Sequence, residues 1–112
     1  LVELTIAKGQ AGDVEELLNG MASEIQVREP GTEIWSWFWS EDRTSVFIHE
    51  RYRDENAVFT HLTNFGEFAD RFLALLTPAV FTVLANPSPQ LREAIAGFGP
   101  TYLVPAGGFR RK

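Results

Sequence analysis

The fold is decided by residues 29–61, which read EPGTEIWSWFWSEDRTSVFIHERYRDENAVFTH. Residues 32–40 alternate between two faces, as a β-strand requires, and one face carries three tryptophans: Trp35, Trp37 and Trp39. The opposite face is also apolar, so this strand needs cover on both sides. Residues 41–43 then predict a hairpin turn, and residues 44–53 predict the partner strand.

A strand and an amphipathic helix are predicted upstream of this hairpin. Residues 1–7 alternate in hydrophobicity and predict a half-buried strand. Asp13 is the expected N-cap of the helix that follows. The helix has one apolar stripe, formed by Val14, Leu17, Leu18, Met21 and Ile25. Pro30 ends it, because the residue before a proline avoids the α region.

Two helical segments and a strand are predicted downstream of the hairpin. Asp54 is the expected cap of a short helix whose inner side carries Ala57, Val58, His61 and Leu62. Asn64 marks its expected end. Residues 65–76 carry a second helical stripe that Pro78 closes, and residues 79–85 predict another strand.

The order of these elements over residues 1–85 predicts one α+β domain, a ferredoxin-like βαββαβ sandwich with an antiparallel sheet. Such a sheet is covered by its own helices on one face and is bare on the other. We expect a homodimer in which two bare faces enclose a cavity and hide the tryptophans.

Residues 86–112 form an extension, packed on the same domain or across the dimer. It has a helix capped by Ser88 and a short strand at residues 101–104.

The composition restricts the classes of function. Hydrophobic residues make up 45% of the chain and charged residues 22%, as in ordinary soluble domains. A net charge of -5 argues against nucleic acid as a partner. The absence of cysteine excludes disulfides and thiolate metal sites. No apolar run is long enough for a membrane span and no signal peptide is recognisable, so we expect a cytoplasmic protein without a membrane partner.

Neither a metal site nor a nucleotide cofactor is expected. The chain has only two histidines, His49 and His61, and their spacing does not pair them with a carboxylate. No glycine-rich phosphate loop opens a helix after a strand.

Three features follow one another in a fixed order along residues 1–85. Glu29-Pro30-Gly31-Thr32 follows the amphipathic helix, the aromatic strand comes next, and the spacing Glu50-x-Tyr52-x-Asp54-x-x-Ala57-x-x-x-His61 completes the series. In this combination the chain resembles the antibiotic-biosynthesis-monooxygenase-like family. The extension after residue 85 is similar to tails in a subset of these proteins.

The resemblance implies a dimeric α+β barrel with a pocket between the sheet and the helices of each subunit. Some members oxidise quinols or anthrone-type polyketides with molecular oxygen and no cofactor. Related folds degrade haem, isomerise small lactones or bind small effectors, so the fold does not fix the function. Haem-degrading relatives carry a tryptophan on the helix before the histidine, where this chain has Val58 and Phe59.

His61 is the first candidate catalytic residue. It faces the predicted core, and the resemblance places the matching histidine in the pocket. A histidine titrates near neutral pH and can accept a proton from an acidic phenol or an activated carbon. It can equally be a structural residue that ties the helix end to a strand. Tyr52 and Asn64 are candidate donors to the resulting anion; Tyr52 can instead be a core residue, and Asn64 a helix cap.

Five further residues are candidates for substrate binding: Trp35, Trp37, Glu50, Phe65 and Phe68. The tryptophans can form a platform for a flat ligand, or they can belong to the core and the dimer interface. Glu50 lies on an apolar strand face, so it needs a partner. It is either a base or one half of a structural ion pair with Arg51 or Arg71 of either subunit.

The functional hypothesis is a cofactor-free monooxygenase that acts on a small electron-rich aromatic, such as a quinol or a polyketide phenol. His61 removes a proton, and the substrate anion itself reduces oxygen. The alternative is a homodimer of the same fold that binds a small apolar or aromatic ligand without catalysis. A measurement of oxygen consumption distinguishes the monooxygenase from the non-catalytic binder.

Overall fold

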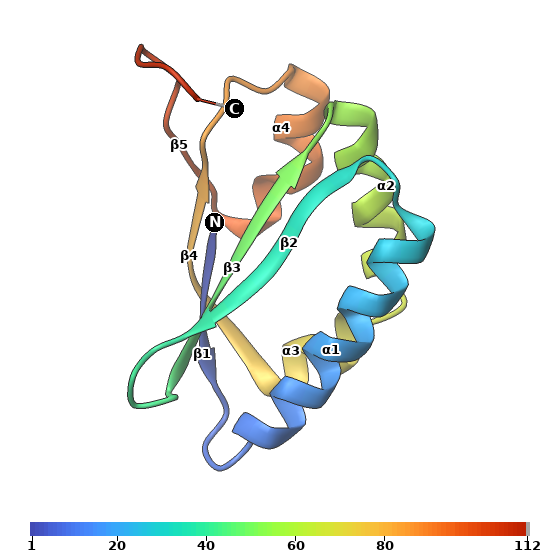
Figure 1. Ribbon diagram of the computed structural model, residues 1–112, viewed down its shortest axis with the longest axis vertical. Coiled ribbons are helices and arrows are strands. Elements are labelled where there is room, and N and C mark those ends of the chain that lie inside the picture. Colours follow the sequence, from blue (N-terminus) through green and yellow to red (C-terminus); the bar gives the residue numbers. More distant parts are fainter. Residues whose placement is uncertain (112) are drawn as a thin grey trace.

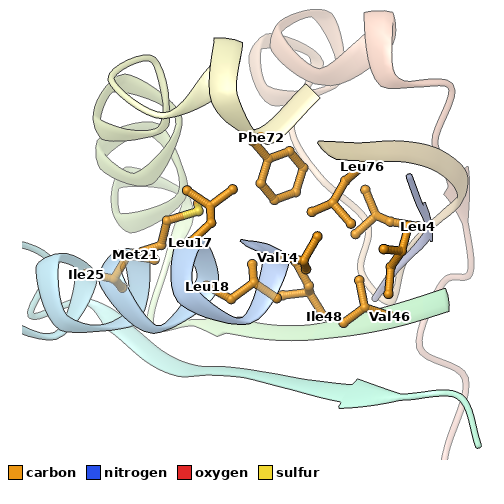
Figure 2. Close-up of a cluster of buried hydrophobic side chains, with 11 residues drawn as sticks. Leu4, Val14, Leu17, Leu18, Met21, Ile25, Val46, Ile48, Phe72 and Leu76 are labelled. Atoms are coloured by element: carbon orange, nitrogen blue, oxygen red, sulfur yellow. The ribbon is translucent and has the colours of Figure 1, made fainter. Parts of the chain in front are cut away.

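One amphipathic helix packs along one face of a five-stranded sheet and organises the molecule (Figure 1). The computed structural model describes residues 1–111. Figure 2 shows the core where this helix meets the sheet and Phe72. Its buried members are Leu4, Ile6, Val14, Leu17, Leu18, Met21, Ile25, Val46, Ile48, Phe72 and Leu76. The predicted apolar stripe of the first helix is therefore confirmed.

The strands are β1 (Val2–Ile6), β2 (Thr32–Trp39), β3 (Ser45–Tyr52), β4 (Leu76–Val83) and β5 (Thr101–Tyr102). The helices are α1 (Ala11–Arg28), α2 (Glu55–Phe65), α3 (Ala69–Leu75) and α4 (Pro89–Ile95), followed by a 3₁₀ turn at Ala96–Phe98. The sheet order is β2-β3-β1-β4-β5, antiparallel except for the parallel β4–β5 pair. The first four strands have the ferredoxin-like arrangement, which confirms the predicted fold.

The three tryptophans lie on the helix-covered face of the sheet. Trp37 is paired with Ile48 across the β2–β3 ladder and Trp39 with Val46, and both partners are core residues. The tryptophans pack against this core as half-buried residues. The prediction that a facing sheet hides them is therefore wrong. The bare face carries other apolar side chains, with Phe38 58% exposed, and the homodimer stays a prediction.

Two helix caps formed as predicted and one did not. The Asp54 carboxylate accepts a hydrogen bond from the Ala57 backbone N–H, and Ser88 caps α4 in the same way. Asp13 lies inside the first turn of α1, which begins after Gln10 without a side-chain cap. Its charge still lies where the helix dipole favours an anion.

The last strand of the domain begins earlier than predicted. β4 starts at Leu76 and includes Pro78, which was expected to close the preceding helix. Pro78 is aligned with Leu4 beside a bulge in the β1–β4 ladder. β5 pairs only with Thr82 and Val83, so Pro78 lies on an edge segment, where a missing N–H costs no ladder bond.

The C-terminal extension packs on the same molecule. Glu55 at the start of α2 accepts hydrogen bonds from both the backbone N–H and the hydroxyl of Ser88. Leu91 and Ile95 of α4 are buried, and the Arg92 guanidinium lies 4.1 Å from the ring centroid of Tyr102. Within residues 1–111, no helix has both the length and the apolar character that a membrane span needs.

Two glycine substitutions are expected to change stability in opposite directions. A Cβ at Gly31 would lie 2.6 Å from the Ala57 Cβ, so Gly31→Ala forces the loop after α1 away from α2. We expect a loss of about 1–3 kcal/mol in the free energy of unfolding. Gly20, within α1, has open space around it, so Gly20→Ala should add about 0.5–1 kcal/mol. Urea denaturation of both variants checks this pair, and equal effects would contradict it.

Candidate active site

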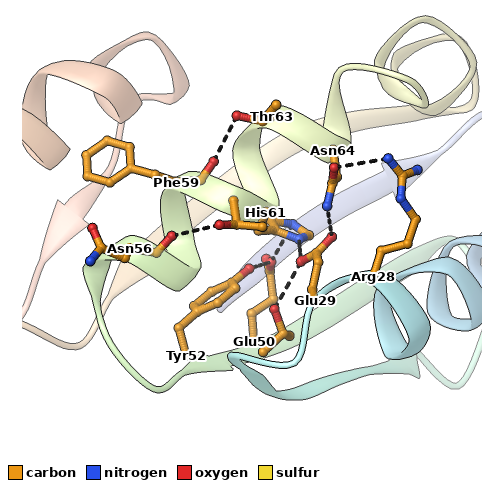
Figure 3. A network of polar contacts seen from close by, with 11 residues as sticks. Arg28, Glu29, Glu50, Tyr52, Asn56, Phe59, His61, Thr63 and Asn64 are labelled. Atoms are coloured by element: carbon orange, nitrogen blue, oxygen red, sulfur yellow. Dashed lines mark hydrogen bonds and ion pairs between the residues drawn. The ribbon is translucent and has the colours of Figure 1, made fainter.

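Three elements bring four polar side chains together beneath the sheet (Figure 3). The C-terminal end of α1 supplies Glu29, β3 supplies Glu50 and Tyr52, and α2 supplies His61. Glu50 and Tyr52 share the core face of β3, because they lie two residues apart in a strand. His61 lies one turn after Ala57, on the buried side of α2. The predicted inward orientation of His61 is confirmed.

His61 lies between two carboxylates. Its Nδ1 atom is 2.8 Å from Oε1 of Glu29, and its Nε2 atom is 3.3 Å from Oε1 of Glu50. The Tyr52 hydroxyl donates a short hydrogen bond to the same Glu50 oxygen. Among residues 1–111, both contacts to Glu50 reach Oε1 and leave Oε2 without a protein partner.

This geometry favours a positively charged imidazole. A neutral histidine would direct a nitrogen lone pair at one of the two carboxylates, whereas an imidazolium donates to both. Burial alone would lower the pKa of His61, but its hydrogen bonds to Glu50 and Glu29, and the charges of both, raise that pKa overall.

Glu50 and Tyr52 are shifted by the same network. Burial would raise the pKa of the Glu50 carboxyl, but the His61 and Tyr52 hydrogen bonds and the imidazolium charge lower it overall. Burial and the neighbouring Glu50 charge raise the pKa of the Tyr52 hydroxyl. The geometry and the directions of these pKa shifts therefore favour an ionised Glu50, a protonated His61 and a neutral Tyr52.

A second layer of contacts holds Glu29. The Thr32 hydroxyl donates to Oε1 of Glu29 at 3.0 Å, and the Asn64 amide donates to Oε2 at 3.3 Å. The Asn64 carbonyl oxygen in turn accepts from Arg28, which also pairs with Glu67 at 2.6 Å. These contacts fix the orientation of the Asn64 amide and of the Glu29 carboxylate.

Glu50, Tyr52 and His61 also line a cavity of about 800 Å³ that is open to the surface and extends around β3, because His49 and Arg51 of the opposite strand face line it too. The other walls are mainly apolar and come from β1, β4, α2 and α4; they include Val2, Val58, Leu62, Phe65, Phe81, Val83, Leu91 and Ile95. This volume lies within the range of pockets that hold drug-sized ligands. The cluster of Glu50, Tyr52 and His61 thus lies in the wall of a mainly apolar cavity.

The structure separates the predicted site residues into two groups. Glu50, Tyr52, His61, Trp35 and Phe65 all line the cavity. Three others do not: Trp37 packs on the core, and Phe68 and Asn64 line a small crevice on the other side of His61. The predicted role of Asn64 as a donor to an anion therefore stays a prediction, and its side chain does not cap the end of α2. Its side chain binds Glu29 instead.

The predicted arginine partner of Glu50 is wrong within one subunit. Arg51 points to the opposite face of β3 and pairs with Glu33 at 3.2 Å, while Arg71 is exposed. The partner of Glu50 is His61, which approaches from α2. A strand places neighbouring side chains on opposite faces, so Arg51 was excluded by the pattern that placed Glu50 inside.

Glu29 is the residue that the sequence interpretation missed. The sequence pattern marks Glu29 as the end of the first helix and as part of the Glu29-Pro30-Gly31-Thr32 motif but predicts no role for its side chain, yet Glu29 is only 3% exposed. It lies four residues after Ile25 and continues the buried stripe of Val14, Leu18, Met21 and Ile25. A carboxylate at the next position of an apolar stripe is the signal that predicts a buried, partnered acid.

Within the described part of the chain, no group of three or more histidine, aspartate or glutamate side chains is arranged to hold a metal ion. His49, the other histidine, is exposed on β3.

Residues 1–70 match the family model described as antibiotic biosynthesis monooxygenase. This match covers more than half of the chain. The chain belongs to the antibiotic biosynthesis monooxygenase family. Membership supports a monooxygenase-type function and leaves the substrate open. No curated protein matches the chain in sequence.

Two solved structures have the same fold as this family member. MupZ from Pseudomonas fluorescens has a TM-score of 0.88 and 18% identity, over 98% of this chain and 90% of its own. A Deinococcus radiodurans protein assigned to the antibiotic biosynthesis monooxygenases has a TM-score of 0.58 and 18% identity, over 78% of this chain and 94% of its own. At this identity the similarity shows the fold alone.

The charged cluster predicts a bell-shaped dependence of stability on pH. Folding lowers the pKa of Glu50, so the ionised carboxylate stabilises the folded state at pH values above 4.5, the usual pKa of a glutamate. This stabilisation is lost as the pH falls through the lowered pKa. Folding raises the pKa of His61, so the protonated imidazole stabilises the folded state fully at pH values below 6.5, the usual pKa of a histidine. This stabilisation is lost as the pH rises through the raised pKa. The free energy of unfolding should be highest between these two values.

Urea denaturation across the pH range checks this profile. A His61→Gln variant should lose the decline on the alkaline side, because it has no imidazole to deprotonate. An alkaline decline that is identical in wild type and variant would contradict the assignment.

Proposed function

We propose that this chain is a cofactor-independent monooxygenase that acts on an electron-rich aromatic with an acidic O–H or C–H group. The observation that carries the proposal is the free Oε2 oxygen of Glu50 beside a protonated His61, at the edge of an apolar cavity. Family membership supports the reaction class.

The substrate proton passes to Oε2 of Glu50. A lowered pKa makes this carboxylate a weak base, so the reaction needs the substrate anion to be stabilised where it forms. The His61 imidazolium supplies that stabilisation through its charge, because it lies beside Glu50 in the cavity wall where the anion forms. A fixed charge of this kind acts strongly in a mainly apolar site.

The substrate then supplies the electrons. In an anthrone-type substrate, the carbanion reduces oxygen and forms a carbon–oxygen bond, which gives a peroxide. The peroxide takes up the proton and loses water, so one oxygen atom stays as a carbonyl and the other leaves as water. One CH₂ group and one O₂ molecule give one C=O group and one water, and no external reductant is needed.

The volume of the cavity favours a substrate larger than a single ring. A cavity of about 800 Å³ is in the upper part of the range for small-molecule sites. The wall formed by β4 and α4 lies beyond the 70 residues that define the family match. Leu91 and Ile95 of that wall are therefore candidates for contacts that select the substrate.

Oxygen uptake tests the proposal. The purified, metal-stripped protein is mixed with a panel of quinols and anthrones, beside His61→Ala. We expect uptake above the spontaneous rate in the wild type and its loss in the variant. No uptake across the panel, together with retention of an apolar ligand, would favour the non-catalytic binder instead.

A further inference from the structure

A pair of phenylalanines lies in the cavity wall apart from the charged cluster. Phe81 of β4 and Phe98 of the 3₁₀ turn after α4 both line the cavity, and their ring centroids are 5.9 Å apart. Phe98 is 43% exposed and Phe81 is half-buried, so both rings have surface that a ligand can contact. Both residues follow residue 70, where the family match ends. Family membership therefore does not explain this pair.

The sheet register gives the span between this pair and the proton acceptor Glu50. Ile48, Val2 and Phe81 are aligned across β3, β1 and β4. Glu50 follows Ile48 by two residues, so it lies on the same face of β3. With neighbouring strands about 4.8 Å apart and a rise of about 3.3 Å per residue, the backbones of Glu50 and Phe81 are about 12 Å apart. Val2 lines the cavity between them, and a single phenol ring at Glu50 is shorter than this span.

The chain around Phe98 holds its ring beside β4. Gly99 has φ +65°, a left-handed conformation that glycine adopts at no steric cost, and it ends the 3₁₀ turn. The chain then pairs, as β5, with the two residues that follow Phe81. At the other end of α4, Ser88 is hydrogen-bonded to Glu55 of α2. These contacts fix α4 and the turn beside β4 and α2 (Figure 1).

The cavity wall around the two phenylalanines is apolar. The neighbouring residues of β4 and α4 that line it are Val83, Leu91 and Ile95. Two polar lining residues already have partners: both oxygens of Glu55 accept from Ser88, and the Asn86 carbonyl oxygen accepts from Arg92 at 2.9 Å. A polar group that loses water without finding a new partner weakens binding, so a ligand group next to Phe81 and Phe98 binds best when it is apolar.

We propose that Phe81 and Phe98 form a distal subsite that selects substrates with an apolar group opposite the reacting O–H. This inference rests on the proposed function and adds to it the shape of the substrate. The O–H group meets Oε2 of Glu50, the ring lies over Val2, and the apolar group reaches the two phenylalanines. That group is an alkyl chain or a further fused ring. Phe81 and Phe98 bind the substrate and take no part in proton transfer.

Tryptophan fluorescence titrations test the subsite without turnover, because Trp35 lines the same cavity. The ligands are phenol and its para-ethyl, para-butyl and para-hexyl derivatives, added under nitrogen so that no oxygen is present to react. Each methylene that becomes buried should lower Kd by about fourfold until the chain fills the subsite. The derivative with a butanoate chain, which ends in a carboxylate, should bind more weakly than para-butylphenol. A Kd that is constant along the series, or no binding by any member, would overturn the proposal.

Phe98→Ala assigns the effect to the distal subsite. The variant should leave Kd for para-ethylphenol within about twofold, which also shows that the cavity is intact, and raise Kd for para-hexylphenol at least about tenfold. The matched control is Phe109→Ala, which removes an 85% exposed phenylalanine of the same extension that does not line the cavity. It should change neither Kd. Equal losses for the short and the long ligand in Phe98→Ala would overturn the proposal.

Oxygen uptake with the same phenols separates failure of the subsite from failure of the proposed function. When both hold, kcat/KM rises with chain length in the wild type and the rise is smaller in Phe98→Ala. Tighter binding of longer ligands without oxygen uptake supports the subsite and contradicts the monooxygenase. Oxygen uptake with a kcat/KM that does not depend on chain length supports the monooxygenase and overturns the subsite.

Discussion

Glu50→Gln is expected to lower kcat by at least about 100-fold, the size of effect typical for loss of a general base. The amide has nearly the same shape and can still accept the hydrogen bond from Tyr52. It cannot take up the substrate proton, and it removes one of the two charges that keep His61 protonated. The loss should appear in kcat more than in KM, because the apolar walls that bind the substrate are unchanged.

Glu33→Gln is the matched control for Glu50→Gln. Glu33 is 47% exposed and makes an ion pair with Arg51. Steady-state oxygen uptake with one substrate compares the two variants. Equal kcat values in wild type and Glu50→Gln would contradict the assignment of Glu50 as the proton acceptor.

His61→Ala is expected to destabilise the fold by about 3–5 kcal/mol at neutral pH, in addition to abolishing turnover. The substitution removes the cation between two buried carboxylates, Glu29 and Glu50, which then lack a counter-charge. The loss should shrink under acid conditions, where the Glu50 carboxylate no longer needs a counter-charge once it is protonated. Chemical denaturation measures the free energy of unfolding of wild type and variant.

Two further variants make this result specific. His49→Ala removes the exposed histidine on β3 and should change stability by less than about 0.5 kcal/mol. Adding Glu50→Gln to His61→Ala should recover part of the lost stability, because it removes an unpaired charge. Additive losses in this double variant would contradict the account of the charged cluster.

The elements of the fold were predictable because their signals are local. Alternation along β2 and β3, the apolar stripe of α1 and the caps at Asp54 and Ser88 depend on residues close in sequence. The face of β2 that meets the helices was not predictable in this way. Both faces of that strand are apolar, and only the pairing of Trp37 with Ile48 decides between them.

The sequence predicted most residues of the candidate site, but it did not predict which of them contact each other. Period-two alternation placed Glu50 and Tyr52 on one face, and helical spacing turned His61 inward. The contact between His61 and Glu50 joins β3 to α2 and depends on how these elements pack. The contact between His61 and Glu29 spans 32 residues. Strand alternation excludes Arg51 as a partner of Glu50, but no local pattern identifies His61 as the partner instead.

The measurement that tests the central claim most directly is the fate of the two atoms of oxygen-18 gas in a reaction of the metal-stripped protein with an anthrone-type substrate. The account predicts one labelled atom in the product carbonyl and one in water, with labelling lost in Glu50→Gln. Product without label, or labelled product formed equally well by Glu50→Gln, would contradict it.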